Sequence, residues 1–342
     1  MVWLSTHLPL RLVGPSSLES TLIRPFLAVL LTTQIALLSA SADRTSAAES
    51  DITINVSDDI VRLGKQVTVS GEGPGLRRLV LQLKTRENGW QPVDTMTTGL
   101  GGAYSFRAPD WRGTHRLRVV APATLVFAQS VSSTRRVTVK MPYDPRGKAS
   151  DWTWLSHRGA RWDPCRTITY RVNPRGSFRG STADIRRTFR QVGQVTGFRF
   201  EYLGRTSKKV RRDRLGYHPS GTDVVVDWQS PKEEAGLSGR VVGIGGHWVE
   251  DRRRFAGYML LDQTRGLSRA TWRQVMTHEL GHVLGLGHAH SRRQLMYGIS
   301  SPLNVLLGAG DLAALARIGA SQGCVAKSAG RAGAVPAPVD AA

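Results

Sequence analysis

The sequence predicts an α+β protein with two folded parts: an all-β module followed by a domain that mixes strands with long helices. Two observations carry this prediction. Between residues 52 and 140, short runs alternate apolar and polar residues and are separated by glycine-rich turns, which is typical of β-strands. After residue 161, strand-like runs are interspersed with stretches whose apolar residues recur at helical spacing. We therefore expect one all-β module and one mixed domain.

The composition of the 342-residue chain leaves room for about two domains with ordinary cores, since 40% of its residues are hydrophobic. The formal net charge is +21, from 47 Lys and Arg against 26 Asp and Glu. These basic residues are spread over the whole chain without a nucleic-acid-binding module, so we expect no specific nucleic acid partner. A solvated basic surface is the plain interpretation, and attraction to an anionic cell-envelope polymer is the alternative. The oligomeric state is left open.

Residues 1–42 have the features of an export signal. Positive charge precedes an apolar run from Phe26 to Ala40, and Ala40-Ser41-Ala42 gives an A-x-A-type cleavage site. We therefore expect a secreted, extracellular protein, with residues 43–51 as a short polar linker. The alternative is a membrane-anchored protein whose N-terminal segment is not cleaved.

Residues 52–140 form the all-β module. Strand-like runs such as 79–83 and 117–120 alternate with turn clusters such as 71–75, and this spacing predicts an antiparallel β-sandwich. The stretches GWQPVDT and TTGLGGAYSFRAP resemble Ig-like or fibronectin-like modules attached to secreted bacterial proteins. No catalytic constellation is visible in this module. We expect it to position the rest of the chain on a surface or partner, or to act as a prodomain.

The mixed domain is expected to span residues 161–325, after a linker at 141–160 and before a disordered tail at 326–342 that is rich in Ala, Gly and Pro. We expect Ser181 to cap a first helix and Ser268 to cap a second helix that runs through His282. Strands are predicted at 168–172, 198–202, 223–228 and 258–262, with an edge strand at 241–247 and a last helix from Asp311.

The motif that specifies chemistry lies on the second helix. Residues 278–288 read HELGHVLGLGH, and Met296 follows in a short Leu-Met-Tyr segment. His278 and His282 are four residues apart, so both imidazoles leave one face of the helix and can share one metal ion. Gly285 can end the helix in a sharp turn that brings His288 round as a third ligand.

Three protein ligands leave the fourth zinc position for water, which is the arrangement of a catalytic site. Zinc lowers the pKa of such a water to about 7, and Glu279 beside the first ligand can take its proton as general base. The expected reaction is attack of the resulting hydroxide on a polarised carbonyl.

The stretch resembles the metzincin metallopeptidases, and within them the matrixins, whose signature is H-E-x-x-H-x-x-G-x-x-H followed by a methionine turn. The resemblance implies a twisted, mostly parallel sheet over long helices, one Zn²⁺ held by His278, His282 and His288, and Glu279 as the catalytic residue. It also implies Met296 as an apolar floor under the metal. The implied activity is a zinc metalloendopeptidase with a protein or peptide substrate.

The sequence departs from the matrixin pattern in one respect. Many matrixins carry a second, structural zinc and calcium ions before the active-site helix. The available candidates do not reproduce the structural-zinc spacing, so we expect no such zinc and leave Ca²⁺ open. These candidates are His218, Asp223, Asp227, His247 and Asp262.

Two cysteines, Cys165 and Cys324, lie near the ends of the mixed domain. In a secreted protein they are expected to form a disulfide that closes a long loop. The alternative for Cys165 is an inhibitory propeptide cysteine, but no PRCGxPD-like context surrounds it. Two rival functions also stay open: a surface-binding protein with a non-catalytic zinc site, and a zinc hydrolase of cell-wall peptides.

Overall fold

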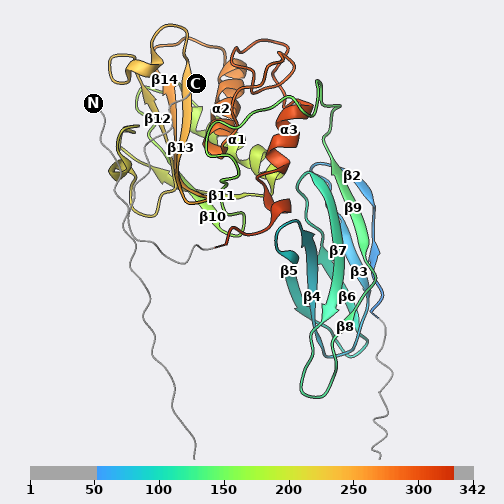
Figure 1. The fold of residues 1–342 in the computed structure, drawn as a ribbon. Helices are drawn as coiled ribbons and strands as arrows, with labels where there is room; N and C mark the ends of the chain where they lie inside the picture. The colour runs from blue at the N-terminus through green and yellow to red at the C-terminus, as the bar shows by residue number, and fades with distance from the viewer. Residues whose placement is uncertain (1–51, 327–342) are drawn as a thin grey trace, which may run out of the picture. The chain divides into compact units, whose positions relative to one another are not determined.

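The computed structural model describes residues 52–326, and Figure 1 labels their helices and strands. The predicted signal peptide, the 43–51 linker and the tail beyond Ala326 lie outside the described residues. The described part combines β-sheets with three α-helices, so the α+β prediction is confirmed. Within this part, no helix is both long and apolar enough to cross a membrane.

The N-terminal module consists of two sheets that enclose one core. The three-stranded sheet has the order β1-β3-β6 and the larger sheet β2-β9-β7-β4-β5, with β8 paired to β7. Buried Val69 and Phe106 from the small sheet meet Leu81 and Leu117 from the large one. The bounds are β1 Asn55–Val56, β2 Ile60–Arg62, β3 Thr68–Glu72, β4 Arg78–Thr85, β5 Gly89–Thr97, β6 Ala103–Arg107, β7 Gly113–Ala121, β8 Ser130–Val131 and β9 Arg135–Lys140.

One strand pair corrects the prediction of a purely antiparallel sandwich. β2 runs parallel to β9, with Ile60 opposite Thr138 and Arg62 opposite Lys140. The two strands are far apart in the sequence, so no hairpin fixes their relative direction.

The second sheet has the order β11-β10-β12-β14-β13. The first four strands are parallel. β13 is an edge strand, as predicted for 241–247, and it pairs antiparallel with β14. The bounds are β10 Thr167–Val172, β11 Arg199–Arg205, β12 Val224–Gln229, β13 Gly243–Glu250 and β14 Arg253–Asp262.

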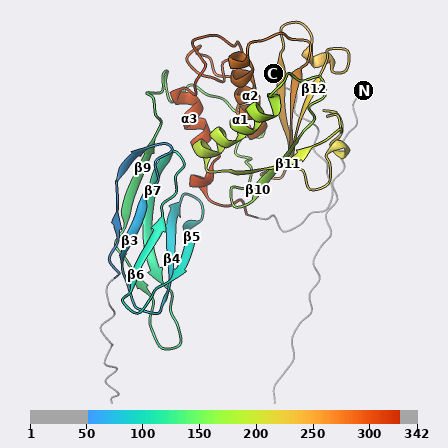
Figure 2. The ribbon, with the colours of Figure 1, turned by 180° about the vertical axis from the view of Figure 1, so that it is seen from behind.

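Both faces of this sheet are buried. Successive residues of a strand point to opposite faces, so neighbouring residues of β12 pack into different cores. On one face, Val224 and Val226 pack with residues of α1 (Ser181–Thr196), α2 (Arg269–Leu284) and α3 (Ala309–Ala316). On the other face, Val225 packs with Trp248 and with Leu237 from the short 3₁₀ helix Ala235–Leu237. Figure 2, which views the molecule from behind, shows α1 and α2 beside the sheet. Two further 3₁₀ helices are Leu215–Tyr217 and Ala320–Gln322.

The start of α1 corrects one predicted cap. Gly180 takes the N-cap position with φ 89°, and Ser181 is already the first helical residue. The Ser181 hydroxyl therefore donates a hydrogen bond to Ser177 Oγ at 2.8 Å instead of accepting one from the helix. Asp184 does not close a capping box, because its carboxylate accepts hydrogen bonds from Arg269 and Arg273 of α2.

Candidate metal centre

The ends of α2 fix the position of the histidines. The Ser268 side chain accepts a hydrogen bond from the Thr271 N–H at 3.1 Å, as predicted for an N-cap. At the other end Gly285 has φ 105°, a left-handed conformation that glycine adopts without strain. A Cβ at residue 285 would also lie only 2.2 Å from Arg254 Nη2. The helix therefore stops at Leu284, and the chain turns back toward it.

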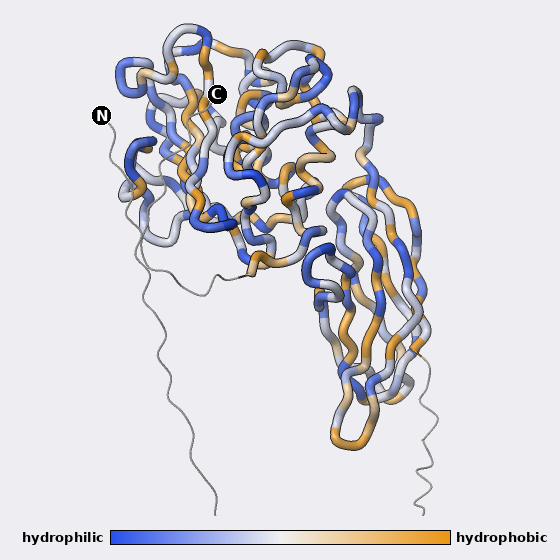
Figure 3. The backbone as a smooth tube through the Cα atoms, viewed as in Figure 1, coloured by the Kyte–Doolittle hydropathy of each residue, from blue (hydrophilic) through white to orange (hydrophobic). Residues whose placement is uncertain are grey.

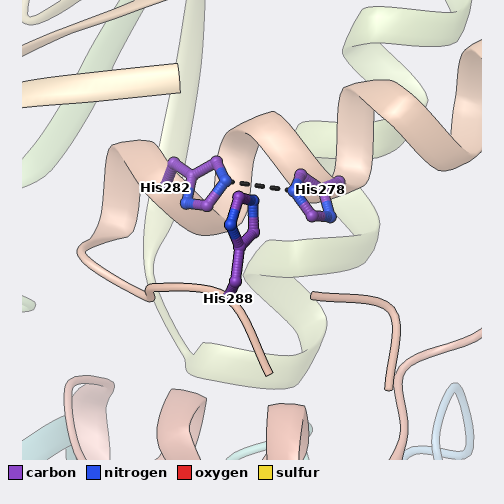
Figure 4. Close-up of side chains that lie close together, drawn as sticks. All are labelled: His278, His282 and His288. Atoms are coloured by element: carbon purple, nitrogen blue, oxygen red, sulfur yellow. Dashed lines mark hydrogen bonds between the residues drawn. The ribbon is translucent and has the colours of Figure 1, made fainter. Parts of the chain in front are cut away.

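The structure brings the three predicted ligands together. His278 and His282 point from α2 toward His288, which follows the turn (Figure 4). One nitrogen from each ring lies within 4.8 Å of the others, and the Nε2 atoms of His278 and His282 are 3.0 Å apart. Tetrahedral zinc with Zn–N bonds of about 2.0–2.1 Å needs its nitrogens about 3.3 Å apart, so the donors fit such an ion.

The hydrogen bonds made by two Nδ1 atoms determine which ring nitrogens can bind a metal. His278 Nδ1 lies 2.9 Å from the Leu295 carbonyl, and His282 Nδ1 lies 2.7 Å from the Leu286 carbonyl. Carbonyl oxygens only accept hydrogen bonds, so each Nδ1 carries the proton and each Nε2 carries a lone pair. Two lone pairs that face each other repel unless a cation lies between them. This arrangement is typical of metal-binding histidines held by carbonyl partners.

Burial favours the neutral imidazoles that a metal ion requires. It lowers the pKa of His278 to about 4 and lowers the pKa of His282 well below its ordinary value. Burial also lowers the pKa of His288. All three rings are therefore free of the second proton at neutral pH.

Glu279 belongs to α2, and its side chain lies between this helix and the edge strand β13. Its side chain is only 5% exposed, and burial raises its pKa to about 8, against the opposing effect of a hydrogen bond from the Gly245 backbone. A Cβ at Gly243 would lie 2.8 Å from Glu279 Oε1, and one at Gly245 would lie 2.1 Å from the Glu279 carbonyl oxygen. Only glycine at these two positions lets the strand approach the helix so closely.

Met296, which the resemblance implies as an apolar floor under the metal, contacts α2. It is buried, and a Cβ at Gly281 of α2 would lie 2.3 Å from its sulfur. The turn is held by Asp311 of α3, whose carboxylate accepts hydrogen bonds from the Leu295 and Met296 N–H groups at 2.6 and 3.2 Å. From the sequence, Asp311 was expected only to start a helix, because nothing local to it indicates the distant turn.

The candidates for a second metal site do not come together as a ligand group in the described residues. His218 contacts the Gly257 carbonyl, and Asp262 pairs with Arg265. His247 Nδ1 lies 2.9 Å from the His282 carbonyl, so this histidine connects β13 to α2. His290, just after the motif, has an 84% exposed side chain. Of the remaining candidates, Asp223 accepts a hydrogen bond from Thr169. Asp227 accepts hydrogen bonds from Val210, Trp228 and Gln229.

Cys165 and Cys324 form a disulfide, as predicted. The alternative, that Cys165 serves as an inhibitory propeptide cysteine, is therefore wrong in this structure. The bond links the beginning of the mixed domain to the segment after α3.

Comparison with known proteins connects this geometry to a family. Residues 222–318 match the family model of the matrixin peptidases, a range that includes β12–β14, α2, all three histidines and α3. The match supports a matrixin-like domain and a metallopeptidase function for this part of the chain. A search of the curated proteins found no match.

Two solved structures show slight similarity to part of the chain. One is the sulfur carrier protein SoxY from Chlorobium limicola f. thiosulfatophilum, with 23% identity, 27% of this chain and 82% of that chain covered, and a TM-score of 0.21. The other is a CARDB domain from Pyrococcus furiosus in complex with di-metal ions, with 17% identity, 27% and 92% covered, and a TM-score of 0.19. Similarity at this level indicates neither fold nor function here, and the Ig-like resemblance of residues 52–140 stays a prediction.

Proposed function

We propose that residues 161–325 form a secreted zinc metalloendopeptidase of the matrixin type. The observation that carries the proposal is the pair of Nε2 lone pairs facing each other at 3.0 Å, with His288 beside them and a buried glutamate adjacent to the first ligand. The matrixin match to residues 222–318 supports the same chemistry.

In this proposal His278, His282 and His288 hold the metal. A bound zinc ion supplies Lewis-acid chemistry, which polarises a carbonyl and makes water more acidic. Glu279 accepts the proton of the attacking water and returns it to the leaving amine nitrogen. Burial raises the pKa of this carboxyl, and the positive charge of a zinc ion on the neighbouring histidines would lower it and favour the carboxylate that accepts the proton.

The edge strand β13 is proposed to bind the substrate. It pairs only with β14, so its outer edge has no strand partner among residues 52–326. An extended peptide can add to such an edge through backbone hydrogen bonds. Because β13 also packs against Glu279, a peptide bound there would run past the metal site. This arrangement favours a peptide substrate over a small molecule.

The test is hydrolysis of casein by purified residues 43–342, with zinc content measured on the same sample. Glu279→Gln keeps the shape of the side chain but cannot act as a base, so we expect activity to fall by about 10²–10⁴-fold with zinc retained. The matched control is Glu201→Gln, an exposed glutamate on β11, which should leave activity unchanged.

The outcomes separate the rival functions. His282→Ala should lose both zinc and activity, and a chelator should abolish hydrolysis by the wild type. Full zinc occupancy without cleavage of casein, but with cleavage of cell-wall peptides, would indicate the wall hydrolase. Zinc binding without hydrolysis of either substrate would contradict an enzyme and favour a binding protein.

A further inference from the structure

Three loops of the β-sandwich lie together at one end of the module, and we refer to residues 73–77, 98–102 and 122–129 as the loop end. The register places them there: Glu72 at the end of β3 is opposite Ala103 at the start of β6. Arg78 at the start of β4 is opposite Thr97 at the end of β5, and Ala121 of β7 is opposite Ser130 of β8. The chain therefore turns at this end three times.

The three loops are held to one another. The Leu76 N–H donates to the Gly99 carbonyl at 3.1 Å, and Thr98 Oγ1 donates to the Pro74 carbonyl at 2.6 Å. Arg77 connects the third loop, because its Nη2 donates to the Pro122 carbonyl at 2.8 Å and its guanidinium lies 4.7 Å from the Phe127 ring centre. Because of these contacts, the three loops form one continuous surface.

This surface exposes large apolar side chains. Leu125 is fully exposed, and Leu100, Val126, Leu76 and Phe127 are 84%, 82%, 67% and 50% exposed. They are five of the thirteen large hydrophobic residues exposed in the described part of the chain. Figure 3 shows the loop that joins β7 to β8 in orange at one end of the sandwich. Exposed apolar clusters of this kind mark interaction sites.

The backbone conformation of the loops keeps these apolar side chains exposed. Leu76 adopts φ 53°, a left-handed conformation that is unfavourable for a residue with a branched side chain. The Thr124 hydroxyl accepts a hydrogen bond from the Phe127 N–H at 3.1 Å, and the Thr124 N–H donates to the Phe127 carbonyl at 2.9 Å. These bonds hold Leu125 and Val126 outward at the tip of a closed turn.

The charge and shape of the loop end point to one partner. Its three loops contain no Asp or Glu, and the exposed Arg78 directly follows the first loop, in a chain of net charge +21. Arg77 is buried against the third loop, and the exposed Glu72 directly precedes the first loop. The apolar side chains project from separate loops, and a fluid apolar phase can take up projecting side chains at any spacing. We infer that the loop end inserts its apolar side chains into the interface of an anionic lipid bilayer.

The entry point of the chain supports a membrane over a protein partner. The Thr53 N–H bonds to the Glu72 carbonyl at 2.9 Å, so the chain enters the sandwich at the loop end. It leaves at the opposite end, where Val139 of β9 pairs with Gly113 at the start of β7. The preceding sequence contains the apolar run 26–40, which meets a membrane either as an export signal or as a retained anchor. The loop end is therefore the end of the module at which the chain arrives from that segment.

The test measures binding to sedimented vesicles of phosphatidylglycerol mixed with phosphatidylcholine, compared with phosphatidylcholine alone. The protein is residues 43–342, because the buried core residues of the described part lie within 52–318 and removal of 1–42 also removes the competing apolar segment. The variant is Leu125→Ser with Val126→Ser. The matched control is Ile60→Ser with Val93→Ser, two exposed apolar residues of the same module away from the loop end.

We expect the wild type and the control to bind anionic vesicles, and the loop variant to bind at least about tenfold more weakly. Binding should weaken on vesicles that lack the anionic lipid, because the exposed Arg78 and the positive net charge of the chain then lose their partners. Equal binding of the variant and the wild type would overturn the proposal. So would absent vesicle binding combined with self-association that the variant abolishes, since a second copy would then cover the loop end. Casein hydrolysis does not enter these measurements, so failure here leaves the proposed function intact.

Discussion

Glycines set the distance between the edge strand and the active-site helix. Gly243 and Gly245 lie in a strand-like run, and the sequence predicts only an edge strand there. Their role depends on Glu279 and His282, which are more than thirty residues away in the sequence. Gly285, by contrast, could be predicted, because its conformation follows from its place at the end of a helix.

Gly245→Ala should disrupt the site. The new Cβ would lie 2.1 Å from the Glu279 carbonyl oxygen and 2.9 Å from His282 Cβ, so β13 and α2 would have to move apart. We expect a stability loss of about 1–3 kcal/mol and at least a tenfold loss of activity. Urea unfolding and casein hydrolysis measure the two effects.

The matched control is Gly266→Ala. A Cβ added at this glycine would meet no atom within 4 Å, and its φ is not positive, so both properties should stay within error of the wild type. If Gly245→Ala kept the stability and activity of the wild type, as Gly266→Ala should, the close approach of β13 to α2 would not be required for either property.

At the scale of elements, α3 holds the turn that carries Met296. Asp311 is fully buried and accepts hydrogen bonds from the N–H groups of Gly308, Leu295 and Met296. The helix itself was predicted from its apolar spacing. Its contact with the turn was not, because a carboxylate in a first helical turn is usually just a favourable charge there.

Asp311 should make stability depend on pH. Burial raises its pKa from 3.8 to about 6, so between these values the folded state binds more protons than the unfolded state. The free energy of unfolding contributed by this group therefore falls as pH rises through that window and is level above it. At about 1.4 kcal/mol per pKa unit, the change is on the order of 3 kcal/mol.

The measurement is urea unfolding of the wild type and Asp311→Asn across that pH window. Because asparagine does not titrate, the stability difference between the two proteins should shift in favour of the wild type at the acid end. Asp213→Asn, which removes a 62% exposed carboxylate, should show no such shift. A difference that does not vary with pH would show that Asp311 titrates at its ordinary pKa.

For the whole molecule, the order of strands and helices in residues 161–325 could be predicted because each element has its own period and its own end signals. Ser268 and Gly285 are such signals, and both lie where predicted. Ser181 failed as a cap because Gly180, one residue earlier, took the left-handed position. The parallel pairing of β2 with β9 and the gathering of three loops at one end of the sandwich depend on chain crossings that leave no local trace in the sequence.

The disulfide acts at the scale of the whole mixed domain. Cys165 and Cys324 are 159 residues apart, and a crosslink of that span restricts the unfolded chain by an entropy worth about 5 kcal/mol in the loop-closure model. Replacing both with alanine should lower the free energy of unfolding by up to that amount, as measured by urea denaturation. Reducing agent should weaken the wild type to the same extent and leave the double variant unchanged. If the reductant destabilised the double variant as well, or if the replacement had no effect, the disulfide would not be what restrains the ends of this domain.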